Sequence, residues 1–159
     1  MHGRARLSAA LRGRPSAFLG AILLTGVLAA CSSSVEVADP ADAGSPSCRS
    51  AALHWPKTVG GQPLRPTTSS SAAVRAWGDP AIIARCGLAP IGPTTDQCVS
   101  VSGVDWVAHQ LGDGMRFTTY GRSPAIEVLV PSAYRPEPLL LPAFGAAASA
   151  IPQGERHCL

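Results

Sequence analysis

The sequence is poor in the residues that most often mark a binding or catalytic function. Only 5% of its 159 residues are aromatic and 14% are charged, and Lys57 is the single lysine among 13 basic residues. Five cysteines are too few for a dense disulfide scaffold, whereas a hydrophobic content of 46% excludes wholesale disorder. The apolar run near the N-terminus, residues 17–27, is shorter than the ~20 residues that cross a bilayer. Length and composition therefore predict one small globular domain.

Catalytic motifs are also missing. The sequence contains no GxSxG, HExxH, P-loop or GxGxxG pattern. Asp79, Asp105 and Asp113 fit helix caps and turns better than a paired general acid and base. We therefore predict no catalytic residue, no cofactor and no metal site. Because triads assemble from residues far apart in the chain, an envelope hydrolase or transferase with an active site that no motif reveals is the alternative.

The N-terminus has the pattern of a bacterial lipoprotein signal peptide. Basic residues precede the run at 17–27, which has the length of a signal-peptide hydrophobic region. The run is followed by Leu28-Ala29-Ala30-Cys31, which looks like a lipobox, a motif whose cysteine is acylated before cleavage. The alternative is an ordinary small-residue cleavage site followed by a chance cysteine. We predict a signal peptide over 1–30 and an acylated Cys31 that anchors the protein in the lipid bilayer, on the extracytoplasmic face of the cell membrane.

Removal of this leader changes the charge of the protein. Nine basic and ten acidic residues lie after residue 30, so the formal charge changes from +3 for the full chain to −1. A near-neutral domain lacks the basic surface that neutralises nucleic-acid phosphates. We therefore predict no nucleic-acid partner, and expect the unknown partner to be an envelope protein or a cell-wall ligand.

The rest of the chain divides into a tether and a domain. Ser32–Ser47 is small, polar and acidic, so it cannot bury enough apolar surface to offset its ordering entropy. We predict a lipidated cysteine and flexible tether over 31–47. A single extracytoplasmic domain then occupies 48–159.

The four cysteines of this domain are expected to form disulfides, because they lie on the oxidising side of the membrane. Four cysteines allow three connectivities. We favour Cys86–Cys98, a short local loop, together with Cys48–Cys158, which would tie the two ends of the domain together. The alternative is a metal site with Cys48, His54, His157 and Cys158 as ligands. It is disfavoured because no CxxC or HxxxH spacing supports it.

Glycine, proline and serine residues mark the expected ends of helices and strands. The segments between them predict an α+β fold, a small four-stranded antiparallel sheet with helices packed on one face. Ala72–Trp77 and the segment from Pro80 to Cys86 are interpreted as short helices. A third helix, with apolar residues at helical spacing, is expected to begin near Leu141 because Pro142 delays it. The four strands are predicted at Gln97–Val101, Val104–Leu111, Met115–Tyr120 and Ala125–Val130.

Register arguments predict which residues share a face of this sheet. Pairing Leu111 with Met115 places Val107, His109 and Phe117 on the core face, where His109 is a core or rim histidine. The other face then carries aromatic residues beside a charged pair, as binding platforms do. We favour instead that residues 53–68 cover this face and bury its tryptophan, because an uncovered patch of this size would be a liability. The candidate binding surface consists of Trp106, Arg116, Tyr120, Arg122 and Glu127.

Several motifs in one order resemble a known family, the actinobacterial lipoprotein family catalogued as domain of unknown function 3515. The resemblance covers residues 48–158. It implies a small extracytoplasmic domain of high-GC Gram-positive bacteria, with no activity, cofactor or site that can be carried over. The motifs are Trp77-Gly78-Asp79-Pro80, Arg85-Cys86-Gly87, Cys98, Gly103-Val104-Asp105-Trp106, the run from Phe117 to Pro124, and Cys158.

The anchor, the tether and the missing motifs together predict a membrane-anchored, non-catalytic binding or accessory module of the cell envelope. The envelope hydrolase or transferase is the competing hypothesis. Neither composition nor motifs identify a ligand.

Overall fold

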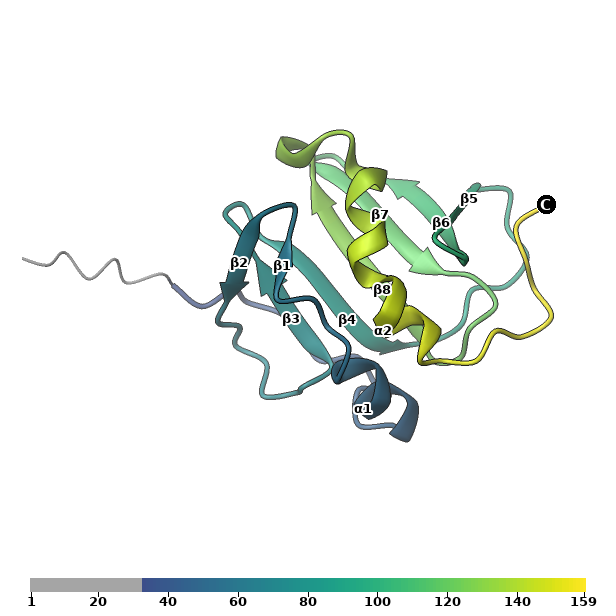
Figure 1. Ribbon diagram of the computed structural model, residues 1–159, viewed down its shortest axis with the longest axis horizontal. Helices are drawn as coiled ribbons and strands as arrows, with labels where there is room; N and C mark the ends of the chain where they lie inside the picture. The colour runs from purple at the N-terminus through teal and green to yellow at the C-terminus, as the bar shows by residue number, and fades with distance from the viewer. Residues whose placement is uncertain (1–32) are drawn as a thin grey trace, which may run out of the picture. The chain divides into compact units, whose positions relative to one another are not determined.

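The structure is a computed structural model that describes residues 33–159; the predicted signal peptide at 1–30 and Cys31 lie outside this range. The described chain forms one eight-stranded antiparallel sheet in the order β1-β2-β3-β4-β8-β7-β6-β5 (Figure 1). Its strands are β1 (Thr58–Val59), β2 (Gln62–Arg65), β3 (Val74–Trp77), β4 (Ile82–Leu88), β5 (Gln97–Val101), β6 (Val104–Gln110), β7 (Gly114–Thr119) and β8 (Ala125–Pro131).

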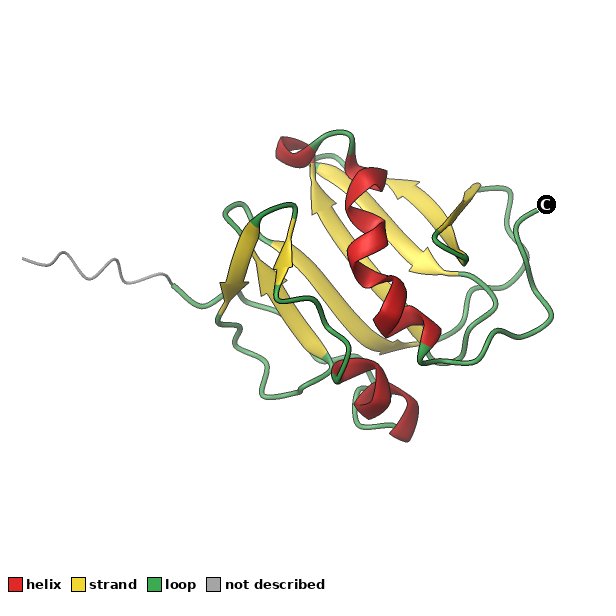
Figure 2. Cartoon of the chain, in the orientation of Figure 1, coloured by secondary structure: helices red, strands yellow, loops and turns green. Residues whose placement is uncertain are grey.

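The predicted α+β class is therefore wrong. The described residues contain only two short α-helices, α1 (Pro46–Ala52) and α2 (Gly145–Ser149), so the fold is mainly β (Figure 2). The four predicted strands exist as β5 to β8, and consecutive strands pair as expected. The other four strands were not predicted.

Strands β3 and β4 replace the two helices predicted at the same positions. They pair with Trp77 opposite Ile82 and Val74 opposite Arg85. Val74, Ala76 and Trp77 are all fully buried, so both faces of β3 are covered. A strand buried on both faces has no alternation of apolar and polar residues, and the period-2 signal is lost.

The C-terminal helical segment covers one face of the sheet (Figure 2). It follows the short 3₁₀ turn η1 (Ser132–Tyr134) and consists of the 3₁₀ helix η2 (Glu137–Phe144) continued by α2. Its buried stripe agrees with the predicted one except at its start, where Leu141 is buried in place of the predicted Leu140. The α-helical part begins only at Gly145, three residues after Pro142. The stripe consists of Leu141, Phe144, Ala147, Ala148 and Ile151.

The core lies between this segment and the sheet. Trp77 packs edge-on against Phe144, with ring centroids 5.5 Å apart. Trp106 and Phe117 belong to the same buried cluster. Burial of Trp106 was favoured over an exposed platform and is found, but the C-terminal helical segment, rather than residues 53–68, supplies the cover.

The predicted register of β6 on β7 is shifted by one residue. Gln110, not Leu111, pairs with Met115, because the turn contains four residues and Leu111 N donates to Gly114 O at 2.8 Å. A shift of one residue moves every side chain of a strand to the other face. Trp106 therefore faces the core opposite Thr119, whereas the outer face carries Asp105, Val107, His109, Arg116 and Thr118.

All four domain cysteines form disulfides, but the predicted pairing is wrong. Cys48 of α1 bonds to Cys86 of β4, and Cys98 of β5 bonds to Cys158 in the C-terminal tail. The sheet order explains the error, because β8, β7 and β6 lie between β4 and β5. Four strand spacings amount to about 19 Å, beyond the reach of a disulfide.

Residues 33–47, which belong to the predicted flexible tether, are bonded to the domain. Val35 forms a β-bridge with Thr67, and Asp42 N donates to Gly87 O at 3.1 Å. Gly87 has a φ of 118°, and a Cβ at this position would collide with the backbone of Asp42 and Ala43. A glycine at this bulge of β4 thus permits the close approach of the N-terminal segment.

Candidate functional site

The five residues of the predicted binding surface do not form one surface. Trp106 is fully buried in the core, and its Nε1 has no hydrogen-bond partner within residues 33–159. Arg116 and Glu127 belong to strands β7 and β8 and share the outer face, opposite the helical segment. Tyr120, which follows β7, lines a cavity, and Arg122 lies in the turn after it.

Arg122 holds the end of the C-terminal helix. Only 5% of its surface is exposed, and its Nη1 donates to the carbonyl oxygen of Ile151, just past α2. A guanidinium at a helix C-terminus interacts favourably with the helix dipole. Burial lowers the pKa of Arg122, and the negative charge of Asp105 opposes this effect. Its contacts are thus those of a structural residue.

Glu127 is also engaged in the fold. Its carboxylate oxygen Oε1 accepts a hydrogen bond from Arg85 Nε at 2.8 Å, across the β4–β8 pair. The Glu127 side chain is 5% exposed and that of Arg85 is 27% exposed. Arg116 is half-buried on the same face. This part of the outer face therefore carries the largely buried Arg85–Glu127 ion pair and the half-buried Arg116.

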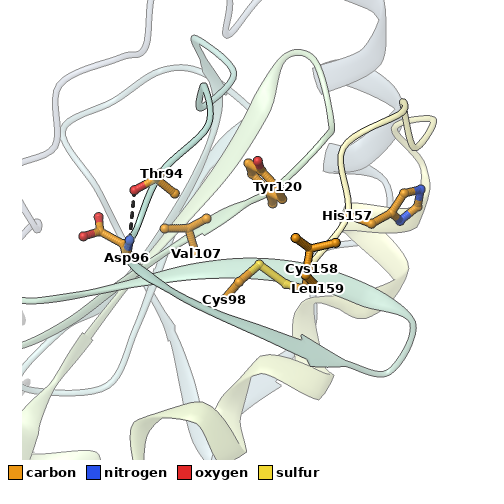
Figure 3. A pocket seen from close by; sticks show the side chains of 8 residues that line it. All are labelled: Thr94, Asp96, Cys98, Val107, Tyr120, His157, Cys158 and Leu159. Atoms are coloured by element: carbon orange, nitrogen blue, oxygen red, sulfur yellow. Dashed lines mark hydrogen bonds between the residues drawn. A yellow bond between two sulfur atoms is a disulfide. The ribbon is translucent and has the colours of Figure 1, made fainter.

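Tyr120 takes part in lining a polar cavity, which we call the Tyr120 cavity. It has a volume of about 220 Å³ and lies between the outer face of the sheet and the C-terminal tail. Figure 3 shows Thr94 and Asp96 on one side and His157 on the other, with the Cys98–Cys158 disulfide between them. Its complete lining is Thr94, Asp96, Cys98, Val107, Tyr120, His157, Cys158 and Leu159.

Two histidine–carboxylate pairs border this cavity. His157 Nδ1 lies 3.4 Å from Asp105 Oδ2, which also accepts a hydrogen bond from Cys158 N at 3.1 Å. His109 Nδ1 lies 3.5 Å from Asp96 Oδ2. His109 was predicted on the core face, but the register shift places it exposed on the outer face. The cavity thus offers imidazole and hydroxyl donors together with carboxylate acceptors.

The bonds that the residues of the Tyr120 cavity already form limit the reactions it could support. Both cysteines that line it are in a disulfide, so neither supplies a thiolate. In the described range, no hydrogen bond joins His109 or His157 to a serine, threonine or tyrosine hydroxyl. The same range holds no group of three or more His, Cys, Asp or Glu side chains placed to bind a metal.

Sequence reasoning identified Tyr120 but missed Thr94, Asp96 and His157. These residues come together because the Cys98–Cys158 disulfide draws the C-terminal tail over β5 and β6. The correct disulfide pairing was the signal that could have revealed them. A smaller, more apolar cavity of about 130 Å³ lies between β4, β8 and the β6–β7 turn, and includes Ile83, Leu111 and Leu129 in its lining.

These features define a disulfide-bonded antiparallel β domain with a polar cavity on the outer face of its sheet. The chain belongs to the family described as Protein of unknown function (DUF3515), whose model matches residues 17–154. The prediction of domain of unknown function 3515 is thereby confirmed. No curated protein and no solved structure matches the chain. Within the described residues, no helix combines the length and the apolar character needed to cross a bilayer.

Proposed function

We propose that the protein is a lipoprotein of the cell envelope whose domain binds a polypeptide segment of an envelope protein at the Tyr120 cavity. Acylated Cys31 anchors it to the extracytoplasmic face of the membrane, and the binding is non-catalytic. The anchor is supported by the lipobox-like sequence Leu28-Ala29-Ala30-Cys31 after an uncharged run. The four cysteines, all in disulfides, agree with an oxidising compartment.

The observation that carries the binding role is the position of the Tyr120 cavity beside an open strand edge. β5 is the last strand of the sheet, and its backbone forms no hydrogen bonds in the described chain except those to β6. Residues 97–101 include no charge and no proline, the two features that usually protect an edge. An extended segment can add to such an edge through its backbone while a pocket receives a side chain.

The lining of the cavity suits this kind of ligand. Tyr120 offers an amphipathic ring, and Asp96 offers a half-exposed carboxylate that accepts hydrogen bonds from a donor side chain. The Cys98–Cys158 disulfide fixes the tail to the sheet, so the cavity is pre-organised.

The envelope hydrolase or transferase remains the second candidate, favoured by one contact. Asp105 Oδ2 lies 3.4 Å from His157 Nδ1, on the side from which a carboxylate orients a catalytic base. However, the nucleophile that such a base requires is not bonded to His157 in the described chain, and the two lining cysteines are in a disulfide.

Photo-crosslinking in cells tests the binding role. A photoreactive amino acid at Thr94 is expected to crosslink one polypeptide, whereas the same amino acid at Ser70, exposed between β2 and β3, is not. Adding Tyr120→Ala to the Thr94 probe should abolish the adduct. An adduct that survives Tyr120→Ala, or that forms equally from Ser70, would contradict the proposed site.

A further inference from the structure

The described chain is fixed to the domain from its first residue onward. Arg65 Nη2 donates to Ser33 O at 3.0 Å. Val35 N donates to Pro66 O and Thr68 N donates to Val35 O, each at 2.9 Å. Val37 N also donates to the hydroxyl of Thr68 at 3.1 Å. These bonds hold residues 33–37 along β2 and the loop that follows it.

This attachment changes the reach of a lipid anchor at Cys31. A free tether over Ser32–Ser47 would have a root-mean-square length of about 20–24 Å. Cys31 instead precedes Ser33 by two residues, and two extended residues span only about 7 Å. In a chain acylated at Cys31, the link between the bilayer and the segment bonded to β2 is therefore only about two residues long.

We propose that the β2 end of the domain is held directly against the phospholipid headgroups; this rests on the lipid anchor of the proposed function. The contact surface comprises Leu64, Arg65 and the adjoining segment at Ser33. Leu64 is one of the few large apolar side chains exposed in the described chain, at 49%. An exposed apolar side chain suits the headgroup boundary. Arg65 lies beside Leu64, largely covered with 15% of its side chain exposed, in a pair with Asp79 at 3.2 Å.

The same geometry places the Tyr120 cavity far from the membrane. Strand order separates β2 from β5 by six strand spacings, or about 29 Å along the sheet. Figure 1 shows the start of the described chain beside β2 and the C-terminal end beside β5, on opposite sides of the domain. The cavity thus faces a partner segment that lies above the bilayer surface.

Fluorescence quenching of the acylated protein tests this placement. The protein, purified from membranes, is reconstituted in phosphatidylglycerol vesicles that carry a nitroxide on the headgroup. A fluorescent amino acid replaces either Leu64 or Ser100, which is exposed on β5. Mass spectrometry first establishes that Cys31 is acylated. We expect the probe at 64 to lose most of its emission and the probe at 100 to lose none.

A spacer variant supplies the control. Ten Gly and Ser residues inserted between Ser32 and Ser33 should restore the emission of the probe at 64, since only the short link holds it at the membrane. On acylated protein, equal quenching at 64 and 100, or no quenching at 64, overturns the placement alone. Quenching at 64 that persists with the spacer contradicts the short link as its cause. A mature protein without acyl chains on Cys31 overturns the lipoprotein proposal itself and this placement with it.

Discussion

Arg122 and Ile151 join the turn after β7 to the end of the C-terminal helix through a hydrogen bond from Nη1 to the carbonyl oxygen. Arg122 is almost completely buried, although its Nε has no partner among the described residues. Burial of a guanidinium costs free energy, because the charged group loses its hydrogen bonds to water. A hydrogen bond from a charged donor to an orphan carbonyl at the helix end offsets part of that cost.

Replacement of Arg122 by methionine is expected to lower the free energy of unfolding by about 1–3 kcal/mol, because the Ile151 carbonyl loses its donor. Denaturant unfolding followed by tryptophan fluorescence measures the change. Lys57→Gln removes the same charge at an exposed position and should change stability by less than about 0.5 kcal/mol. Equal effects of the two variants would show that charge, and not the helix contact, is responsible.

The ion pair between Arg85 and Glu127 should respond asymmetrically to mutation. Arg85→Met leaves the buried Glu127 carboxylate without a partner, which costs about 3–5 kcal/mol. Glu127→Gln leaves Arg85, which is 27% exposed, able to reach water, so a loss of only about 1–3 kcal/mol is expected.

A double-mutant cycle separates the pair from its surroundings. Arg85→Met combined with Glu127→Leu should recover most of the stability that Arg85→Met alone removes, because no unpaired charge remains. Additive losses in urea unfolding, or a larger loss for Glu127→Gln than for Arg85→Met, would contradict the assignment of Glu127 as the buried partner.

About half of the sheet could be predicted from the sequence. The turn at Ser102 and Gly103 has positive φ at both residues, as a two-residue hairpin requires, and its flanking strands were placed correctly. Glycine-containing turns likewise delimited β7 and β8. In this half of the domain, each strand has turn residues at its ends, so the local sequence was sufficient to place the strands.

The other half required information that no local pattern contains. Val74 and Ala76 are as buried as Trp77, so β3 lacks the alternation that marks a strand, and alanine favours a helical interpretation. The long-range order of strands, which separates Cys86 from Cys98, is a property of the whole sheet. The error in disulfide pairing followed from that missing order.

The candidate site was only partly predictable for the same reason. One extra residue in the β6–β7 turn reversed the faces of β6 and removed Trp106 from the expected surface. Tyr120 was identified as an aromatic residue near a charged pair, but its actual neighbours Thr94 and His157 come from a loop and the C-terminal tail. Only tertiary structure brings these segments together.

The disulfide pairing is directly testable by peptide mapping without reduction. Cys86 and Cys98 lie in one tryptic peptide, since no lysine or arginine separates them, so a second cleavage before Asp96 is needed. We expect Cys48 linked to Cys86 and Cys98 linked to Cys158. Either of the other two connectivities would contradict the sheet order.

The two disulfides should also differ in their response to a mild reductant under native conditions. Cys48 and Cys86 are fully buried, whereas Cys98 and Cys158 are half-buried beside the Tyr120 cavity. Thiol exchange requires access to a sulfur atom, so Cys98–Cys158 should be reduced first. With loop separations of 38 and 60 residues, each bridge contributes about 4 kcal/mol on the chain-entropy account. Alkylation with mass detection identifies which pair opens, and earlier reduction of Cys48–Cys86 would contradict the burial argument.

Stability at alkaline pH should depend on Tyr134. Its hydroxyl donates to Pro80 O at 2.7 Å, and burial raises the pKa of Tyr134 above its ordinary value. The native state then holds the phenolic proton more tightly than the unfolded state does. The contribution of this group is therefore complete below the unfolded pKa near 10 and is lost as the pH rises through the native pKa.

Tyr134→Phe removes this ionisation and the hydrogen bond together. We expect the variant to be less stable than the wild type at pH 8 by about 0.5–1.5 kcal/mol, the usual net value of one such bond. The difference should shrink above about pH 10, where the wild-type phenol ionises on unfolding and the variant has none to ionise. Denaturant midpoints measured from pH 8 to pH 11 test this. A difference that stays constant over the series would show that the tyrosine proton is held equally in both states.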